Sequence, residues 1–456
     1  MSTEALDQSE RKPASATLLP VPDILRAASA SGPVGVRVRV QRPDRHQVGM
    51  RMLALDGLLP EEHPARLVWE YVEGLNLTPL YDQIRAVEGR AGRDAIDPKI
   101  LLALWLYATL DGVGSARQLD RLCVDHVAYQ WICGGVSVNY HTLSDFRTAH
   151  PVFLDELLTQ SVATLMHQDL VTLNRVAQDG MRVRASAGAA SFRRRKTLEE
   201  CQSEAQEQVQ SLREEWEADP GAAGQRQRAA RERAVQERSR RIRRALEELS
   251  EVESKKQAGQ KDQARVSTTD PASRVMKMAD GGFRPAHNVQ FATDTDSQVI
   301  TGVQVVNTGS DQGQMSPMVQ QHQDRYGRVP NQMLVDGGFT KHEDIQKVSS
   351  ADQGTVVYAP VPKPKDPQRD PHEPRAGDSQ VIAAWRQRMG TAEAKEIYKD
   401  RASTAECVNA IARNRGLRQF LVRGLAKVRA VALWLALAHN LMRAVALRAA
   451  AAAMAG

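Results

Sequence analysis

Arg175-Val-Ala-Gln-Asp179-Gly-Met-Arg-Val-Arg-Ala-Ser186 is a β-like run that stops at a carboxylate and restarts past a glycine. An Asp-Gly pair between apolar residues is most often a turn. Two later acids favour another interpretation, because Asp336 ends the apolar run Met333-Leu-Val335 and Glu406 lies in a helix-forming segment. We therefore expect Asp179, Asp336 and Glu406 to form one metal site.

The composition indicates a large protein with a basic excess. Its 456 residues suffice for two or three domains, and its net charge is +6 although Asp and Glu together number 55. A basic balance favours a polyanionic partner. The four cysteines have no paired spacing, which favours a reducing compartment over a disulfide framework; they are Cys123, Cys133, Cys201 and Cys407.

The sequence carries no signal for export or membrane insertion. Its N-terminus lacks the apolar core of a signal peptide. The most apolar stretch, Ala430 to Leu441, is short and contains His439 and Asn440, so we expect a buried helix there. His439 is then a structural residue and not a proton carrier. These features predict a soluble, cytoplasmic protein without a membrane partner.

The first part of the chain predicts a tail and a helical domain. Residues 1–48 are rich in Ser, Ala, Pro and Arg, with one isolated strand-like run at Val36–Val40, and we expect a flexible tail; an arm that contacts DNA is the alternative. Residues 49–169 predict an all-α domain. Asp97-Pro98 supplies the cap and first position of an apolar helix that ends at Leu110.

Further helices are predicted from Ala116 to about Tyr129, from Thr142, and over 151–169. Short helices joined by glycine-containing turns fit a helix-turn-helix-like DNA reader, but they equally fit any small bundle. The candidate DNA contacts in this domain are Arg117, Arg121 and Arg147.

One cysteine and histidine pattern in this domain imitates a zinc site. Cys123-x2-His126-x6-Cys133-x7-His141 has the correct residue types, but its second pair is wider than zinc sites use. We therefore expect Cys123 to be a core thiol.

Residues 193–263 are rich in Glu, Gln, Arg and Lys and predict a charged helical hairpin inserted in the next domain. Their few apolar residues recur at steps of three and four on two segments, which the run Pro220–Gly224 separates. A solvated hairpin and an arm that contacts DNA or a partner both fit this pattern. The apolar residues are Leu198, Cys201, Ala205, Val209, Leu212 and Trp216, then Val235, Ile242, Leu246 and Leu249.

Residues 170–192 and 264–447 predict an α/β domain, followed by a tail at 448–456. Strands are expected at 288–293, 298–306, 332–336 and 355–359, with a helix from Gln312 to Tyr326 and helices from about Ser379. This is the element order of a ribonuclease-H-like domain, in which acids of two central strands and a later helix meet. Oxygen ligands suit two Mg²⁺ or Mn²⁺ ions acting on a phosphodiester. Alternatively, Asp179 and Asp336 are turn residues and Glu406 is a surface acid.

The sequence resembles the DDE transposases of bacterial insertion sequences that have a helical N-terminal domain. The resemblance covers nearly all of residues 50–447 and includes Gly114-Ser-Ala-Arg117, Thr142-Leu-Ser-Asp-Phe-Arg147, Gln178-Asp-Gly180, Asn288-Val-Gln290 and Val335-Asp-Gly-Gly338. The most specific block, Tyr398/Arg401/Glu406/Arg413, is similar to the Tyr-Arg-Glu-Lys signature. This block departs from the signature in two ways: four residues instead of three lie between Arg401 and Glu406, and Arg413 stands in place of lysine.

The resemblance implies that Asp179, Asp336 and Glu406 bind the catalytic metal ions and that Tyr398, Arg401 and Arg413 hold the phosphates of the transposon end. Arginine can bind phosphate through two hydrogen bonds. The implied reaction frees 3′-hydroxyls at the ends of the element and joins them to target DNA, and pairing of two ends implies a homodimer on DNA. Two alternatives remain: an inactive DNA-binding descendant, and a nuclease without strand transfer.

Overall fold

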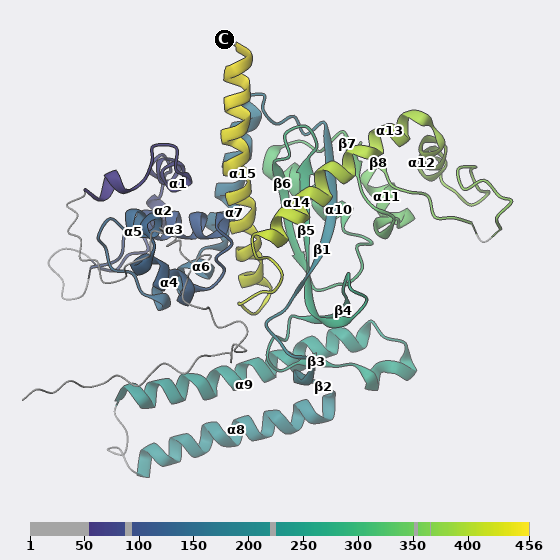
Figure 1. Ribbon diagram of the computed structural model, residues 1–456. Helices are drawn as coiled ribbons and strands as arrows, with labels where there is room; N and C mark the ends of the chain where they lie inside the picture. The colour runs from purple at the N-terminus through teal and green to yellow at the C-terminus, as the bar shows by residue number, and fades with distance from the viewer. Residues whose placement is uncertain (1–53, 87–93, 219–224, 351–353, 365, 456) are drawn as a thin grey trace, which may run out of the picture. The chain divides into compact units, whose positions relative to one another are not determined.

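The computed structural model describes residues 54–86, 94–218, 225–350, 354–364 and 366–455, and the structure mixes helix and sheet (Figure 1). The predicted tail at 1–48 and the strand-like run Val36–Val40 lie outside these residues. Within the described part, a helical region precedes the first long strand. Its helices are α1 (Pro64–Glu73), α2 (Thr78–Tyr81), α3 (Pro98–Leu110), α4 (Ala116–Asp125), α5 (Val127–Cys133), α6 (Tyr140–Ala149) and α7 (Pro151–His167).

Helix α3 is the buried centre of this helical region, as its sequence predicts. The Asp97 carboxylate accepts a hydrogen bond from the Lys99 amide at 2.8 Å, and Pro98 occupies the first helical position. Most of α3 is buried, including Trp105, whose indole donates to the Leu143 carbonyl of α6 at 2.9 Å. The central helix therefore fixes α6 through a buried polar contact.

Two helix boundaries differ from the sequence prediction, and side-chain caps explain both. The helix expected from Ala116 to about Tyr129 is broken at His126, whose Nδ1 accepts from the Ala128 amide and begins α5. The start expected at Thr142 moves to Tyr140, because Asn139 caps α6 by accepting from the Thr142 amide at 3.0 Å. A capping side chain thus decided each boundary.

The sheet has the strand order β6-β5-β1-β7-β8. Strand β1 pairs antiparallel with β5 and parallel with β7, while β6 is antiparallel to β5 and β8 is parallel to β7. A short strand β4 pairs with the start of β5. The strands are β1 (Arg175–Arg184), β4 (Arg274–Lys277), β5 (Phe283–Asp294), β6 (Ile300–Val306), β7 (Gln332–Leu334) and β8 (Val356–Tyr358). The predicted hairpin at 288–306 is therefore β5 and β6.

Helices connect the later strands; the first was predicted from Gln312 to Tyr326, and the second was not predicted. Helix α10 (Met315–Tyr326) leads from β6 to β7, and α11 (His342–Val348) leads from β7 to β8. The buried carboxylate of Asp344 in α11 accepts from the Met315 and Ser316 amides, both at 3.1 Å, so it holds the start of α10. The two connections are thereby joined on one side of the sheet.

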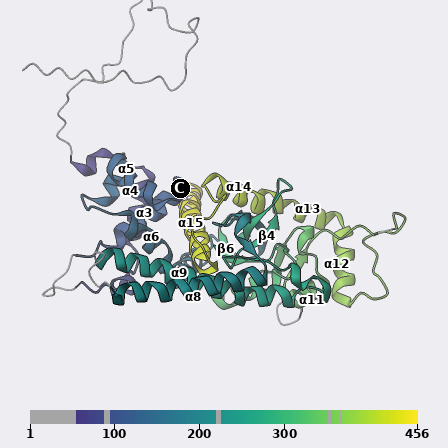
Figure 2. The same ribbon diagram turned by 90° about the horizontal axis from the view of Figure 1, so that it is seen from below.

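The charged insert is a helical hairpin of α8 (Arg195–Ala218) and α9 (Gln225–Ser254), which lie side by side along their lengths (Figure 2). The expected apolar stripes face inward, with Leu198, Leu212, Ile242 and Leu249 buried. At the base of the hairpin, β2 (Phe192–Arg193) pairs with β3 (Val266–Ser267). The hairpin thus has a small core of its own beside that of the sheet.

The chain ends with α12 (Gln380–Gly390), α13 (Ala392–Arg401), a π-helical turn (Ala402–Glu406), α14 (Cys407–Asn414) and α15 (Leu425–Ala455). Helix α15 is longer than the predicted stretch and continues through the residues assigned to a tail. Its length and composition alone would suit a membrane span, but two thirds of its most apolar window, 67%, is buried inside the protein. It packs on α3, α6, α7 and β6, as expected of a core helix.

His439 has the structural role that the sequence predicts. It lies buried in α15 and contacts the Gln298 carbonyl through Nε2 at 2.8 Å, and burial lowers its pKa to about 4. The neighbouring Asn440 side chain accepts from the Ile300 amide and donates to the Ile300 carbonyl, both at 2.8 Å. The two side chains attach α15 to the beginning of the edge strand β6.

Candidate active site

Asp179 lies within an uninterrupted strand and not at a turn. Strand β1 pairs with β5 on both sides of it, with Asp179 opposite Phe291 and Gly180 opposite Gln290. The expectation that the run stops at the acid and restarts beyond it is therefore wrong. Glycine follows the acid because a polar group crowds its backbone: a Cβ on Gly180 would lie 2.9 Å from Asn288 Oδ1 and closer still to Asp311.

Asp336 lies beside Asp179 because of the parallel pairing of β1 and β7. In that register Ala177 is opposite Leu334. Asp179 and Asp336 each lie two residues after this pair. Asp336 also caps a short 3-10 turn, since its Oδ1 accepts from the Gly338 amide at 2.8 Å. Two acids distant in the sequence are thus brought together by strand pairing alone.

Glu406 reaches these acids through Arg401. The guanidinium of Arg401 lies 2.9 Å from Glu406 Oε1, 3.6 Å from Asp179 Oδ1 and 4.0 Å from Asp336 Oδ2. Its side chain is only 11% exposed, whereas those of Asp336 and Glu406 are 40% and 58% exposed. The three predicted metal ligands therefore surround one buried cation, and we call this arrangement the carboxylate cluster.

The extra residue between Arg401 and Glu406 forms a π turn, Ala402–Glu406, between α13 and α14. Single π turns inside α-helices occur frequently at functional sites. The two partners lie five positions apart in the sequence, and the turn leaves them paired on one side of the combined helix. The altered spacing of the signature has thus not separated the arginine from the glutamate.

Burial governs the ionisation of Asp179. It raises the pKa of the Asp179 carboxyl to about 6; Arg401 and the Gly180 amide oppose that rise, and the charges of Asp336 and Asp311 add to it. The Asn409 amide of α14 donates to Asp179 Oδ2 at 2.9 Å. Burial lowers the pKa of Arg401, but the neighbouring Asp179 and the other acids raise it above its usual value. Arg401 therefore stays charged.

Charge is unevenly balanced in the carboxylate cluster, because three carboxylates surround one guanidinium. In the described residues, no group of three His, Cys, Asp or Glu side chains is arranged to hold a metal ion. Arg401 occupies the space between the acids, which explains this observation. The donor set itself consists of carboxylate oxygens, which suit hard divalent cations. The side chains of Asp336 and Glu406, 40% and 58% exposed, leave this side of the cluster open to solvent.

The structure adds a fourth carboxylate that sequence reasoning missed. Asp311 follows β6, and its side chain is 7% exposed. Its Oδ1 accepts from Asn288 Nδ2 and Gln290 Nε2, both at 2.7 Å, and its Oδ2 accepts from Arg182 at 3.0 Å. The sequence Asn288-Val-Gln290 is a local sign of this carboxylate. Its two amide side chains lie at alternate positions of one strand, so they share a face and can donate to a common acceptor.

The other two residues of the signature, Tyr398 and Arg413, differ in their exposure to solvent. Tyr398 is half-buried and donates its hydroxyl to the Val335 carbonyl at 3.2 Å, next to Asp336, and burial raises its pKa. Arg413 is exposed in α14, and its side chain has no hydrogen-bond or ion-pair partner in the described part of the chain. Arg413 is thus available to a ligand, whereas Arg401 is held by the carboxylate cluster.

The three arginines predicted in the helical region lie apart from the carboxylate cluster. Arg117 and Arg121 are exposed on α4, and Arg117 lies over the Tyr140 ring at 5.2 Å. Arg147 of α6 is engaged inside the protein: it donates to the Gly114 carbonyl and lies over the Trp105 ring at 4.6 Å. The structure therefore separates two surface arginines from one that is largely enclosed.

Comparison with known proteins gives two family matches. Residues 53–149 match a family described as Transposase domain (DUF772), and residues 367–445 match a family described as Transposase DDE domain. The second match includes Arg401, Glu406 and Arg413 but ends short of the strands that carry Asp179 and Asp336. No curated protein and no solved structure matches the chain. The two matches, in separate parts of the sequence, place the chain among the DDE transposases of insertion sequences.

Proposed function

We propose that this transposase binds the terminal inverted repeats of its insertion sequence and catalyses metal-dependent strand cleavage followed by strand transfer. The observation that carries the proposal is the carboxylate cluster, in which Asp179, Asp336 and Glu406 come from three separate elements and surround Arg401. A structural ion pair needs one acid. Three acids around one arginine, two of them exposed, are better explained by a second cationic ligand.

The order and directions of the strands support this proposal, because they fit a ribonuclease-H-like domain. The strands occur along the chain as β1, β5, β6, β7 and β8, with the first three antiparallel and the last two parallel to β1. A DDE domain implies such a fold. Placing one acid on the central strand and another just after its parallel neighbour is the arrangement that such a fold requires.

The acids of the cluster fit Mg²⁺ or Mn²⁺. Asp179, Asp336 and Glu406 would hold the ions, which in a two-metal site supply an activated water and stabilise the leaving oxygen of a phosphodiester. Asn409 holds one oxygen of Asp179 in place. Because burial raises the pKa of Asp179 to about 6, this carboxylate is mainly ionised, and able to bind a cation, above that pH.

Exposed arginines near the C-terminal helices support a role in DNA binding. Arg413 is without a side-chain partner in the described residues, and Arg418 and Arg423 are exposed, with their Nε atoms donating to backbone carbonyls. Arg117 and Arg121 add exposed charge on α4. We propose that these side chains contact DNA phosphates, that two copies act together on paired ends, and that the protein works in the bacterial cytoplasm on nucleoid DNA.

The test uses labelled duplexes ending in the inverted repeats that flank the coding region, with Mg²⁺ or Mn²⁺. We expect end-specific cleavage by the wild type, and its loss in Asp179→Asn, Asp336→Asn and Glu406→Gln. Glu396→Gln is the matched control, because Glu396 is an exposed acid of α13 outside the carboxylate cluster.

Each of the other outcomes would lead to a different conclusion about the protein. Specific binding without cleavage would indicate an inactive DNA-binding descendant. Cleavage that ignores the end sequence would indicate a nuclease without strand transfer. Cleavage that survives Glu406→Gln would show that another glutamate completes the site.

A further inference from the structure

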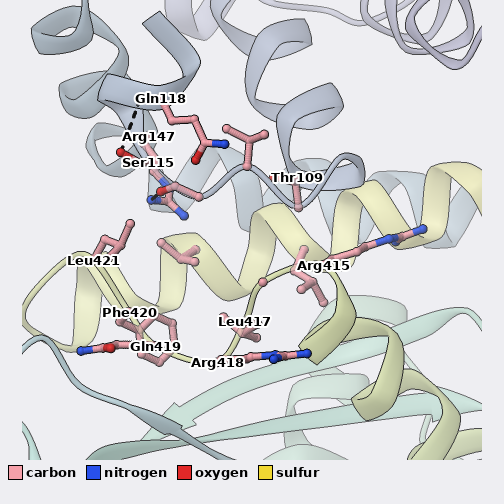
Figure 3. Close-up of a pocket in the computed structure, with 15 residues that line it drawn as sticks. Thr109, Ser115, Gln118, Arg147, Arg415, Leu417, Arg418, Gln419, Phe420 and Leu421 are labelled. Carbon is pink, nitrogen blue, oxygen red and sulfur yellow. Dashed lines mark hydrogen bonds between the residues drawn. The ribbon is translucent and has the colours of Figure 1, made fainter. Parts of the chain in front are cut away.

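Two neighbouring cavities meet at Arg147, where the helical region contacts the loop between α14 and α15. Figure 3 shows the residues that line the first of them. Their volumes are about 240 Å³ and 250 Å³. Gly114, Ser115, Arg147 and Leu421 line both of them. Arg415 and Arg418 also line the first, and Arg117 lines the second. No aspartate or glutamate lines the first cavity, and Asp145 alone lines the second.

Arg147 carries a positive charge that the protein leaves uncompensated. One terminal nitrogen donates to the Gly114 carbonyl, but the buried Nε has no hydrogen-bond partner. Its guanidinium forms no ion pair in the described residues, and burial alone lowers its pKa to about 10. The Trp105 ring beneath it offers only a cation–π contact at 4.6 Å.

Arg415 repeats this situation from the opposite side. Its Nη1 is buried without a hydrogen-bond partner, and the described residues provide no carboxylate to pair with it. Burial lowers the pKa of this arginine too, and no neighbouring charge contributes to the shift. Two guanidinium groups without acids thus line this junction, and the exposed Arg418 adds a third; the side chains of Arg415 and Arg418 point away from Arg147 (Figure 3).

The junction is built firmly enough to hold these groups in place. Trp434 of α15 donates its indole to the Arg147 carbonyl at 2.9 Å. Gly416 packs against the turn before α4, where an added Cβ would lie 3.0 Å from the Gly112 carbonyl oxygen. Burying a cation without a partner costs free energy unless an anion pairs with it. Phosphate oxygens, which accept charge-assisted hydrogen bonds from arginine, would supply that partner to each of these cations.

We propose that this junction, which we call the arginine junction (Arg147, Arg415 and Arg418), binds phosphate groups of the DNA backbone, with Arg147 and Arg415 on separate phosphates. The inference rests on the proposed function, and it adds a DNA-backbone site to which the helical region and the C-terminal segment both contribute. DNA bound there would contact the two parts of the protein at once. A free inorganic phosphate shares the same chemistry, so the experiment separates the two sources.

The experiment measures binding of the full chain to end duplexes in EDTA over a range of salt concentrations. Each phosphate contact that is lost reduces the slope of log K against log salt concentration by about 0.9. We expect that reduction for Arg147→Gln and for Arg415→Gln, and a slope close to the wild type for Arg147→Lys, which keeps the charge. Arg415→Gln keeps the test valid if Arg147→Gln fails to fold, because Arg415 lies in a loop.

Arg388→Gln is the matched control. Arg388 is half-buried, lies over the Tyr358 ring at 5.5 Å, donates to the Val357 carbonyl and has an Nε without a partner, but it lines neither cavity. We expect its salt dependence to equal that of the wild type. A loss of slope in Arg388→Gln similar to that in Arg147→Gln would overturn the assignment, because it would reflect general destabilisation.

Two further outcomes separate this inference from the proposed function. Wild-type binding to duplex DNA with an unchanged slope in both glutamine variants would overturn the arginine junction and leave the proposed function standing. If the wild type binds no duplex, the proposed function fails. Thermal unfolding with inorganic phosphate then tests whether the arginine junction binds free phosphate. A rise in the wild-type melting temperature that both variants lose would support a free-phosphate site, and the absence of a rise would overturn it.

Discussion

Arg401 and Glu406 form a 2.9 Å ion pair across a π turn, five residues apart in the sequence. In a regular α-helix, five steps of about 100° would place the two side chains about 140° apart around the axis. The π turn takes up the extra residue, as such turns do inside α-helices. Tyr398 before it and Asn409 after it both still reach the sheet strands that carry the acids.

Removing one residue of this turn should be tolerated. Deletion of the exposed Ala402 restores the four-residue step at which helix neighbours meet, so we expect Arg401 and Glu406 to stay paired. Cleavage of end duplexes should remain within about tenfold of the wild type, a change of about 1.4 kcal/mol in the barrier. Deletion of Ala410, also exposed but in α14, should abolish cleavage, because it rotates Arg413 by about 100°. Equal loss in both deletions would contradict this explanation.

The meeting of Asp179 and Asp336 could be predicted from the sequence because it depends on strand order. Both acids follow short apolar runs, and parallel neighbours bring such positions to the same edge of a sheet. The helical hairpin was predictable for a related reason, since an apolar stripe at steps of three and four leaves one buried face. The mistaken turn at Gly180 shows the limit of local signals, because the crowding by Asp311 comes from a distant part of the chain.

The rest of the candidate site depends on contacts that periodicity does not encode. Asp311 and Asn409 are single polar residues whose partners lie on other elements. The enclosure of Arg147 between Trp105 and the C-terminal loop arises only when the helical region and α15 pack together. An arginine in a short helix gives no local sign of whether it faces solvent or a junction.

The raised pKa of Asp179 predicts a stability effect with a definite sign. A carboxyl whose folded-state pKa, about 6, exceeds its value of 3.8 in the unfolded chain stabilises the protein below pH 4, and this contribution is lost as the pH rises through 6. Asp179→Asn should therefore gain stability relative to the wild type between pH 4 and pH 7, by at most about 3 kcal/mol. Denaturant unfolding in EDTA at both pH values measures the gain. If the difference in unfolding free energy between variant and wild type does not change with pH, then folding does not raise the pKa of Asp179.

Glycine at position 180 is required by the close approach of Asp311. A Cβ there would overlap Asp311 Oδ1 and Gln290 Nε2, and both groups are tied together in a buried hydrogen-bonded cluster. We expect Gly180→Ala to lower the free energy of unfolding by about 1–3 kcal/mol or more, as overpacking does. Gly188→Ala is the control, because a Cβ at Gly188 would meet nothing within 4 Å. Similar melting temperatures for the two variants would disprove the steric argument.

Asp311 should also affect the chemistry of the carboxylate cluster, because its charge is among the causes that raise the pKa of Asp179. Asp311→Asn removes that charge, so the acidic limb of the pH profile for cleavage should move to lower pH. The variant should also cleave more slowly, because Asn288 and Gln290 lose a carboxylate acceptor at 2.7 Å. Asp344→Asn is the matched control, since Asp344 is a buried carboxylate that binds the start of α10 and is absent from the causes that shift Asp179. It should lower stability without moving the limb. A limb that moves equally in both variants would reduce Asp311 to a packing role.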